Sequence, residues 1–529
     1  MINQNRKFYM ILKFMLEEKS KNKFFLSAFA GAVCNLAFAP FHWFFPILIS
    51  IPIFYFLISV AKNRKETFWF GWFYGFGYFV AGIYWISISL LVDAKQFAWL
   101  IPFAATLIPA VLAIYFALFA LSYKFLVDRF FVKQVYEKVL LFSSLWILFE
   151  ILRSFLFTGF PWNLIGYIWC FNDNFLQISA IFGIWGLSLI AVLVGLIPVL
   201  FISYKNGEFV FNNHLYDKIF GTIIIFILAS SFFYGLYRID SSKLVVDSSK
   251  KLRLVQGNIK QSAKWNLEEK YRNFFKHIRL TNSKDLREVK AVIWSETAVP
   301  YAIDNNSELL NKLKLAVPEE GILITGALRL GYSSLGEVDE VWNSVFNIGD
   351  SGVLDYYDKH HLVPFGEYVP LQKYLPFISK ITDGAMGFSE GEGVKTLKNN
   401  VFSFSPLLCY EVIFSDKIID KNNRPDLLVN LTNDAWFGRS SGPYQHLDMA
   451  KVRSVEYGIS LARVANTGIT AFFNPLGQLV DKIELNDEGV IDVDFVNNIE
   501  PTVYSKFGFY PLFILLSFFG LFIVRNKLK

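Results

Sequence analysis

Two kinds of hydrophobic pattern alternate along the chain. Long apolar segments fill the parts before Arg238 and after Lys506, and shorter runs bounded by polar turn residues fill the part between them. A helix needs roughly 20 apolar residues to cross a hydrocarbon core of about 30 Å. The pattern predicts a polytopic α-helical membrane bundle. Eight segments are interpreted as spans: Phe24–Pro40, Trp43–Val60, Thr67–Val92, Phe97–Leu121, Val139–Leu156, Leu176–Ser203, Ile219–Tyr237 and Phe507–Val524.

The composition indicates lipid surroundings. Apolar residues make up 54% of the chain and 57 residues are Phe, far above the average of soluble proteins. The net charge of +6 is mild, and Lys and Arg gather beside the apolar segments instead of forming a basic stripe with interleaved aromatic residues. We therefore expect a lipid bilayer as a partner, and no nucleic acid.

The loops between the apolar segments differ in charge. Lys and Arg are concentrated before residue 24, at 62–65, 124–138 and 205–218, and after residue 524, all on one side of the predicted bundle. The loops near Phe41, at Asp93–Lys95 and at Thr158–Phe175 are nearly free of them. Because cytoplasmic loops retain positive charge, we expect the central region outside the cytoplasm. The predicted domains are a seven-span bundle at 1–237, an extracytoplasmic domain at 238–505 and a C-terminal membrane helix with its tail at 506–529.

The central region has the pattern of an α/β domain. The short β-rich runs are Leu252–Gln256, Ala291–Trp294, Ile322–Ala327, Ser344–Ile348, Val353–Tyr357, Phe402–Leu408, Leu427–Leu431, Ile469–Phe473 and Val490–Val493. The clearest helical patterns are Leu267–Thr281, Ser307–Leu315 and His446–Val464. Strands and helices that alternate in this way predict a sheet core covered by helices.

Three chemically capable residues follow predicted strands. Glu296, Lys359 and Cys409 come just after strands that end at Trp294, near Tyr357 and at Leu408. A thiol attacks as its thiolate, which needs a nearby base or positive charge. A carboxylate can accept the thiol proton, and an ammonium group can stabilise the thiolate and a later oxyanion.

Each of these residues also has an ordinary explanation. A lone Cys after a buried strand is often a small core residue, and a Glu or Lys in a loop is usually a solvated charge. His360 and His361 suggest a metal, but adjacent side chains tend to point apart and the sequence shows no supporting ligand cluster. We expect no metal and no cofactor. In the bundle, Glu150 and Arg153 are three residues apart and are interpreted as an ion pair or as part of a substrate site.

The sequence around these residues is specific. Trp294–Pro300, Lys359–Pro370 and Cys409–Glu411 resemble, in order and spacing, the Glu, Lys and Cys motifs of the nitrilase superfamily, and they are most similar to its membrane branch, the apolipoprotein N-acyltransferases. Further segments similar to that family are Val255–Ile259, Asn433–Gly438, Gly442–His446, Leu36–Phe41 and Gly159–Trp162. The resemblance covers nearly the whole chain. Ser295 stands where the family has Pro, which concerns only the shape of that loop.

The resemblance implies a fold, a site and a reaction. It implies a nitrilase-type αββα sandwich in which Glu296 is the general base, Lys359 the electrostatic stabiliser and Cys409 the nucleophile. It also implies supporting or substrate-binding positions, which are Glu367, Tyr410, Glu411, Trp265, His360 and Asn433. The implied reaction moves an acyl chain from a phospholipid, typically phosphatidylethanolamine, through a Cys thioester to the α-amino group of a diacylglyceryl-modified apolipoprotein. It takes place on the periplasmic side of a bacterial inner membrane.

Other interpretations of the same motifs remain. A membrane-tethered amidase or nitrilase could use the same triad on a small C–N substrate, although eight spans exceed what a tether needs. The bundle could instead be a transporter or scaffold that carries an inactive binding domain. The loops Phe365–Leu375 and Ile378–Phe388, the second with Gly384 and Gly387, are candidates for a lid that keeps water from a thioester.

Overall fold

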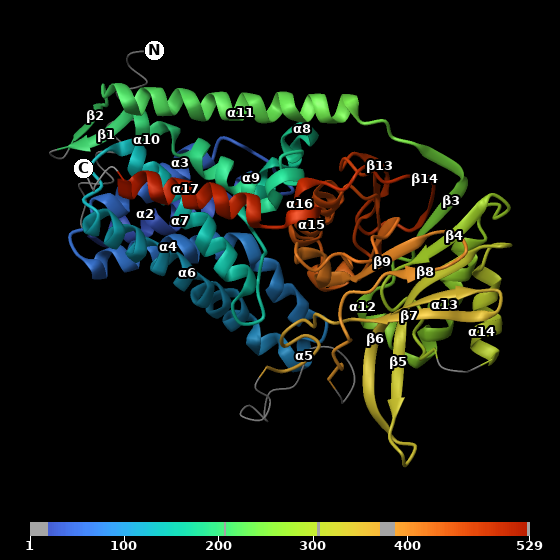
Figure 1. The fold of residues 1–529 in the computed structure, drawn as a ribbon. Coiled ribbons are helices and arrows are strands. Elements are labelled where there is room, and N and C mark those ends of the chain that lie inside the picture. Colours follow the sequence, from blue (N-terminus) through green and yellow to red (C-terminus); the bar gives the residue numbers. More distant parts are fainter. Residues whose placement is uncertain (1–19, 206–207, 304–306, 371–386, 526–529) are drawn as a thin grey trace. The chain divides into compact units, whose positions relative to one another are not determined.

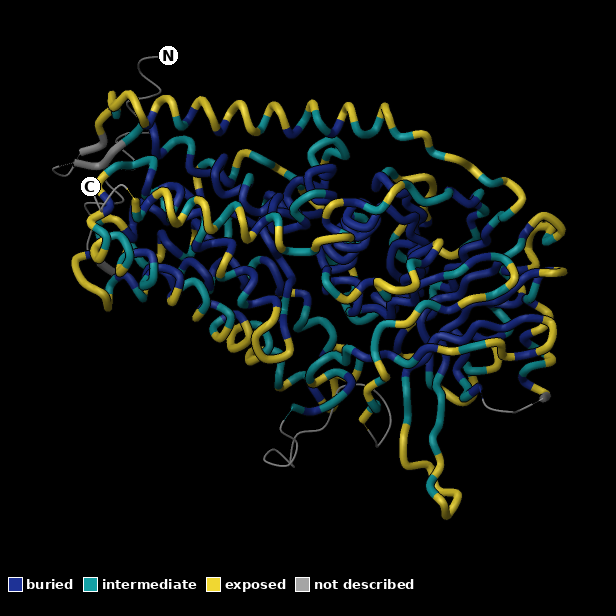
Figure 2. Tube along the Cα trace, in the orientation of Figure 1, coloured by how far each residue is buried: buried dark blue, intermediate teal, exposed yellow. Residues whose placement is uncertain are grey.

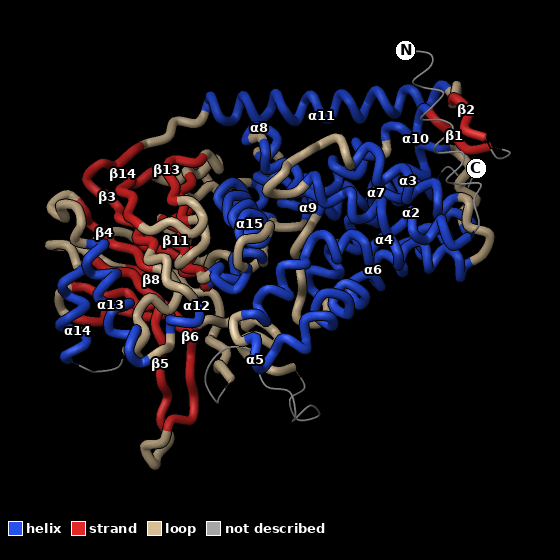
Figure 3. Tube along the Cα trace, turned by 180° about the vertical axis from the view of Figure 1, so that it is seen from behind, coloured by secondary structure: helices blue, strands red, loops and turns tan. Residues whose placement is uncertain are grey.

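The computed structural model describes residues 20–205, 208–303, 307–370 and 387–525. The chain divides into two compact units. The helical unit comprises residues 1–87, 100–239 and 506–529, and the α/β unit comprises residues 88–99 and 240–505. Figure 3 distinguishes them by secondary structure, because most strands belong to the α/β unit.

Each of the eight predicted apolar segments contains a helix. The main helices of the helical unit are α2 (Ser20–Cys34), α3 (Ile47–Ser59), α4 (Arg64–Ile83), α6 (Ile101–Arg129), α7 (Val135–Phe155), α9 (Ser179–Gly195), α10 (Ile197–Phe201), α11 (Leu215–Ser241) and α17 (Tyr510–Arg525). Among the described residues, 4 helical stretches are long and apolar enough to cross a membrane: Arg64–Leu91, Ala94–Arg129, Ser179–Phe201 and Leu215–Ser241. The helices Ile47–Ser59 and Tyr510–Arg525 are apolar but shorter.

Shorter elements connect these helices, and within two of the predicted spans the helix changes its geometry. They are η1 (Asn35–Ala37), η2 (Tyr84–Leu91), α5 (Ala94–Phe97), η3 (Ala98–Leu100), η4 (Ile165–Phe171), α8 (Asp173–Leu176) and the hairpin of β1 (Ile202–Lys205) and β2 (Glu208–Phe211). The α-helix in the predicted span Thr67–Val92 ends at Ile83 and continues as the tighter η2. The predicted span Leu176–Ser203 is not one helix, because Gly183 has φ 65° inside α9 and the chain turns into β1 at Ile202.

Small residues allow close helix packing in the helical unit. A Cβ on Gly31 of α2 would lie 2.0 Å from the main-chain oxygen of Tyr74 on α4, and one on Gly77 would lie 1.8 Å from that of Ala28. Such contacts are typical of helix pairs in membranes, where backbones approach at Gly and Ala. By contrast, α11 is exposed along most of its length (Figure 2), and its Phe226 and Phe233 are 71% and 65% exposed. Apolar side chains displayed in this way suit contact with lipid.

The segment that follows α7 is held by the two ionisable residues near the end of that helix. Glu150 Oε1 accepts hydrogen bonds from the Trp146 indole at 3.1 Å and from the main-chain N–H of Ile165 at 2.8 Å. Arg153 donates to the main-chain oxygens of Phe160 and Trp162, the latter at 2.7 Å. These buried charges therefore orient the aromatic segment of residues 160–165.

The α/β unit contains two six-stranded sheets. The first has the order β14 (Gly489–Val496), β3 (Val246–Gln256), β4 (Val289–Trp294), β5 (Ile322–Tyr332), β6 (Val338–Gly349), β7 (Gly352–Asp358). The second has the order β13 (Leu479–Ile483), β12 (Thr470–Phe473), β11 (Leu461–Ala465), β10 (Leu427–Thr432), β9 (Ser403–Leu408), β8 (Leu397–Lys398). In each sheet three neighbouring strands are parallel, β3–β4–β5 and β9–β10–β11.

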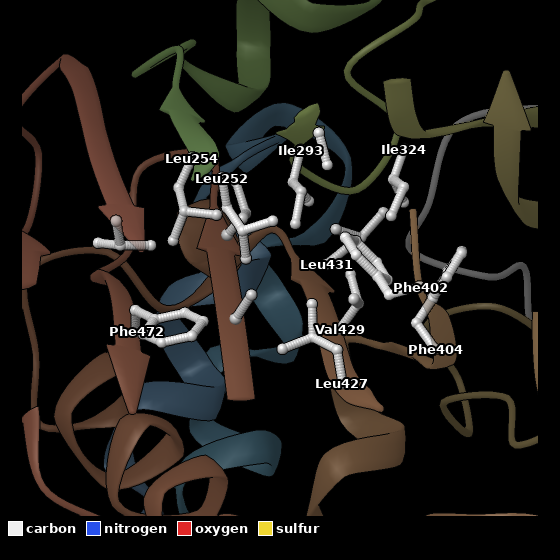
Figure 4. Close-up of a cluster of buried hydrophobic side chains, with 14 of the residues drawn as sticks. Leu252, Leu254, Ile293, Ile324, Phe402, Phe404, Leu427, Val429, Leu431 and Phe472 are labelled. Atoms are coloured by element: carbon white, nitrogen blue, oxygen red, sulfur yellow. The ribbon is translucent and has the colours of Figure 1, made fainter. Parts of the chain in front are cut away.

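The sheets pack face to face over an apolar core. Leu254 and Ile293 from the first sheet lie opposite Val429 and Phe472 from the second (Figure 4), and all four are fully buried. Each such side chain contributes roughly 1.5–3 kcal/mol when it leaves water. A second apolar cluster lies on the other face of the first sheet and includes Phe274 of α13 (Leu267–Thr281) together with residues of α14 (Ser307–Leu313). Figure 1 shows these helices beside that sheet.

The helix α15 (Gly442–Tyr457) packs against β11 of the second sheet, which completes an α–β–β–α layering. The helix predicted at His446–Val464 is wrong in its second part. Helix α15 ends at Gly458, which has φ 66°, and the following apolar run is β11. A left-handed Gly is a common helix stop, and a short buried apolar run has the same pattern in a helix and in a buried strand. The short strands β8 and β13 and the helix α12 (Gln261–Lys264) were also not predicted.

Candidate active site

Strand directions bring the candidate residues to one place. Strand β6 is antiparallel to both β5 and β7, so β7 runs in the direction of β4, and Glu296 and Lys359 leave the first sheet at the same edge. In the second sheet, Cys409 and Asn433 follow the parallel strands β9 and β10. The N–H of Asn258 after β3 donates to the main-chain oxygen of Asn466 after β11 at 2.9 Å. The carboxyl ends of the two sheets therefore adjoin, as expected for functional groups in open α/β sheets.

Two buried carboxylates surround the ammonium group of Lys359. Its Nζ donates to Glu367 Oε1 at 2.8 Å and lies 4.0 Å from Glu296 Oε1. The Lys359 side chain is 1% exposed, and both carboxyl groups are buried. Glu367 Oε2 also accepts from the main-chain N–H of Val363 at 2.8 Å. Glu367 thus fixes the ammonium group and the loop that carries it.

Asn343 links the two carboxylates from the middle of the site. Its Nδ2 donates to Glu296 Oε1 at 2.7 Å and lies 3.3 Å from Glu367 Oε1. Its main-chain oxygen accepts from the N–H of Lys359 at 2.9 Å. The sequence interpretation missed this residue, because a polar position inside a strand gives no signal until the strand's neighbours are known.

Cys409 is buried and has an unusual backbone conformation. It begins the 3₁₀ helix η6 (Cys409–Ile413) directly after β9, with φ 49°. Burial raises the pKa of its thiol to about 12, with a further increase from the Glu296 carboxylate and an opposing decrease from the Lys359 ammonium. The thiol is therefore within electrostatic reach of both groups, and it is protonated at neutral pH.

The charges of the site are set by burial and by the neighbouring groups. Burial raises the pKa of the Glu296 carboxyl, and although Lys359 opposes this shift, it stays above the ordinary value. Burial lowers the pKa of Lys359, but the carboxylates of Glu367 and Glu296 raise it more, so the ammonium form is retained. In this arrangement the thiol proton can pass to the Glu296 carboxylate, whose proton affinity is raised. The Lys359 ammonium meanwhile provides a fixed positive charge near the reacting atoms.

Glu411 joins the loops that carry Cys409 and Lys359. Its Oε2 accepts from the N–H of Leu408 at 2.7 Å, and its Oε1 accepts from the N–H of His360 at 2.9 Å and the Tyr357 hydroxyl at 2.8 Å. Burial raises the pKa of Glu411, but its bonds with His360 lower it more, so the net direction is downward. His360 Nδ1 lies 2.9 Å from Glu411 Oε1. In the described part of the chain no group of three or more His, Cys, Asp or Glu could hold a metal ion.

The remaining predicted positions lie around this centre. Tyr410 is half-buried, and its ring packs against His361 and Phe414. Asn433 is buried and donates to Gln261 of α12 at 2.7 Å. Trp265 directly follows α12, and the Lys270 ammonium lies 5.4 Å from the centre of its ring.

Lys264 is a second cation at the site that the sequence interpretation missed. It is buried at the end of α12, and its Nζ donates to the main-chain oxygen of Glu296 at 3.0 Å. Burial lowers the pKa of Lys264 to about 8, although the nearby Glu296 and Cys409 oppose the shift. The available signal was its place before Trp265, beside a motif already recognised. Of the predicted lid loops, the part at 371–386, which includes Gly384, lies outside the described residues.

Known families match both units. The family described as apolipoprotein N-acyltransferase N-terminal domain matches residues 30–197, and the carbon-nitrogen hydrolase family matches residues 251–503. The second match assigns the two-sheet unit to the nitrilase-type fold. A solved structure similar to this chain is XC1258 from Xanthomonas campestris, a CN-hydrolase superfamily protein. It is 19% identical, with a TM-score of 0.35, over 46% of this chain and 90% of its own.

Curated relatives match along most of the chain. An apolipoprotein N-acyltransferase of Rickettsia prowazekii (strain Madrid E) is 36% identical over 495 residues, which are 92% of this chain and 95% of the relative. Another, from Rhodopseudomonas palustris, is 35% identical over 519 residues, which are 95% of each. Identity at this level over both units shows common descent of the whole architecture. The chain therefore belongs to the apolipoprotein N-acyltransferase family of membrane-associated acyltransferases.

Proposed function

We propose that this chain transfers an acyl chain from a phospholipid to the α-amino group of an apolipoprotein by way of a thioester on Cys409. The observation that carries the proposal is the buried group formed by the Cys409 thiol, the Glu296 carboxylate and the Lys359 ammonium in a nitrilase-type unit. The roles are nucleophile for Cys409, general base for Glu296 and electrostatic stabiliser for Lys359.

In the first half-reaction the donor is a phospholipid, for which we propose phosphatidylethanolamine. The Cys409 proton passes to Glu296 as sulfur bonds to the ester carbonyl carbon. The negative charge that develops on the carbonyl oxygen is stabilised by Lys359. The carbon–oxygen ester bond then breaks, the lysophospholipid oxygen takes the proton from Glu296, and the S-acyl enzyme remains.

In the second half-reaction the acceptor is the N-terminal diacylglyceryl-modified cysteine of an apolipoprotein. Its free α-amino group attacks the thioester carbonyl carbon and gives a proton to Glu296. The carbon–sulfur bond breaks, Cys409 recovers a proton from Glu296, and an amide is formed. Covalent storage of the acyl group divides a transfer between two membrane-anchored substrates into two simpler steps.

The membrane arrangement is part of the same proposal. It includes eight spans, a boundary near residues 237–238 and a catalytic domain on the periplasmic side of the inner membrane, and it is supported by a helix in each apolar segment of the sequence and by the basic loops. Single cysteines can test this orientation, since Cys34, Cys170 and Cys409 are buried and give little background. In intact cells, an impermeant maleimide is expected to label Ser334→Cys and to label Lys62→Cys only after lysis. The reverse pattern would contradict the orientation.

The decisive experiment traps the intermediate. Purified protein is incubated with phospholipid vesicles, and the peptide that contains Cys409 is weighed. The chain and its Cys170→Ala variant are expected to gain the mass of a fatty acyl group that hydroxylamine removes, whereas Cys409→Ala gains none. Addition of a diacylglyceryl-cysteine peptide is expected to remove the adduct and to yield an N-acylated peptide. Release of free fatty acid without peptide acylation would favour a hydrolase.

A further inference from the structure

A buried polar cluster lies directly behind Cys409, on the second sheet. It consists of Thr432 at the end of β10, Asp434 at the start of η7 (Asp434–Phe437), His446 on α15 and Arg463 on β11. All four side chains are at most 1% exposed. Buried charges and polar groups are costly unless they are satisfied, so a cluster of this kind beside a reactive thiol calls for a role.

One member of this cluster, His446, contacts the backbone of Cys409. His446 Nε2 lies 3.1 Å from the main-chain oxygen of Cys409. A carbonyl oxygen only accepts hydrogen bonds, so Nε2 carries the hydrogen and donates it. The imidazole therefore holds the peptide plane that follows the nucleophile.

The other edge of the imidazole is fixed by charged groups. Nδ1 lies 2.9 Å from Asp434 Oδ1 and 3.1 Å from Arg463 Nη2. Arg463 in turn donates to Asp434 Oδ2 at 2.6 Å. Burial raises the pKa of Asp434, but Arg463 and His446 lower it by more, so that it falls to about 2 and this group is a carboxylate. The ring thus has little freedom to rotate away from Cys409.

Asp434 is also connected to the thiol end of Cys409. Thr432 Oγ1 donates to Asp434 Oδ1 at 3.0 Å, and the same hydroxyl is close enough to the Cys409 thiol to lower its pKa. The cluster therefore contacts the nucleophile at two points, its side chain and its main-chain oxygen.

The backbone at Cys409 needs this support. Its φ of 49° lies in the left-handed region, which for a residue other than Gly costs on the order of 1–3 kcal/mol. Because the peptide bond is planar, a fixed Cys409 oxygen also fixes the direction of the Tyr410 N–H on the opposite edge of the same plane. In enzymes with a nucleophile on a sharp turn after a strand, that N–H faces the developing oxyanion.

We propose that His446, held by Asp434 and Arg463, is a positioning residue that locks the strained backbone of Cys409 and so aims the thiol and the next N–H at the substrate carbonyl. This inference rests on the proposed function of Cys409 as the nucleophile. His446 does not contact the acyl donor in this scheme, so it affects kcat and not KM.

The test compares two side chains of similar size, one with an N–H donor and one without. His446→Gln retains a donor and His446→Met does not. His277→Met is the matched control, because His277 is equally buried, on α13, and bonds to the main-chain oxygen of Asn273 instead of that of Cys409. Two rates are measured in the detergent-solubilised full chain: acyl transfer from phospholipid vesicles and alkylation of Cys409 by iodoacetamide, each corrected for the folded fraction.

The expected result is a fall in kcat on the order of 10- to 100-fold for His446→Met with unchanged KM, since a displacement of about 1 Å has effects of this size. The alkylation rate falls with it, His446→Gln recovers most of both rates, and His277→Met keeps both. If His446→Met does not fold, Asp434→Asn is the second variant, with an expected loss of about tenfold in kcat.

Two results would overturn the inference. One is a kcat for His446→Met, or for Asp434→Asn where it replaces that variant, within twofold of the unaltered chain. The other is an equal loss in the Met and Gln variants, which would show that the N–H donor has no part. Failure of the proposed function looks different: the unaltered chain would then form no acyl adduct, while the alkylation rates would still report the hold of His446 on Cys409.

Discussion

Glu367 offers a quantitative test of how Lys359 is held. Its carboxylate accepts a hydrogen bond from the Lys359 ammonium at 2.8 Å, and both groups are buried. Glu367→Gln keeps the size and one acceptor but removes the charge. The bond to Gln still has a charged donor but lacks the attraction between opposite charges. The ammonium therefore loses about 1–2 kcal/mol of binding, a part of the about 1.5–3 kcal/mol that a hydrogen bond between charged groups contributes. It is then free to move from its present 4.0 Å toward Glu296, where it would neutralise the base.

The expected consequence is a slower formation of the acyl-enzyme by roughly 5- to 30-fold, if the lost hold is fully expressed in the transition state. Single-turnover acylation of Cys409, followed by mass at pH 7 and saturating phospholipid, measures this rate directly. Glu390→Gln is the control, because Glu390 is also a carboxylate but is exposed. A Glu367→Gln rate within twofold of the unaltered chain, with an unchanged melting temperature, would refute the assignment of Glu367 as the anchor of Lys359.

Three further predictions concern the same unit. In the first, the acylation rate of Cys409 is expected to decrease as the pH is lowered, with a midpoint above pH 4.5. The reason is that Glu296, whose pKa is raised from 4.5, must be unprotonated to accept the thiol proton. A pH–rate profile with its acid limb below 4.5 would contradict this. The rate is also expected to fall above about pH 8 as Lys264 loses its charge, and the same profile for Lys264→Met should lack this alkaline limb. Gly468→Ala should lower the melting temperature, because the added Cβ would lie 2.5 Å from Asp434 Oδ2 and overpacking costs about 1–3 kcal/mol, whereas Gly520→Ala, with nothing within 4 Å, should not.

The elements that were predicted well carry their own local signals. Helix α13 has the predicted bounds, Leu267–Thr281, because Asn266 caps it by accepting from the N–H of Glu268 at 2.9 Å and because its buried residues recur on one face. The apolar run Leu461–Ala465, which forms β11, had no such signal. It was assigned to a helix, and only its place in the sheet between β10 and β12 makes it a strand.

The residues of the site also fall into two groups, those that the sequence indicates and those that only the fold reveals. Glu296, Lys359 and Cys409 could be selected from the sequence, because each follows a strand end and stands in a specific motif. Asn343 and Lys264 could not, because each acts through a geometry that depends on the fold: one bridges two carboxylates across the sheet, and the other holds a main-chain oxygen of the Glu296 loop. Such residues become visible only when the register of the strands is known.

The buried chemistry of the site also bears on how a transferase avoids hydrolysis. A thiol with a pKa of about 12 is not a standing thiolate at neutral pH, so in the proposed reaction the nucleophile is generated as the proton moves to Glu296 during attack. The same low-polarity surroundings that raise this pKa disfavour the entry of water, which would otherwise compete with the amine for the thioester. A drier site therefore suppresses hydrolysis and makes the rate more dependent on the exact positions of Glu296, Lys359 and Cys409. This dependence explains why buried hydrogen bonds from Asn343, Glu367 and His446 are placed on the triad's side chains and backbone, and why Glu411 binds the N–H of Leu408 next to Cys409.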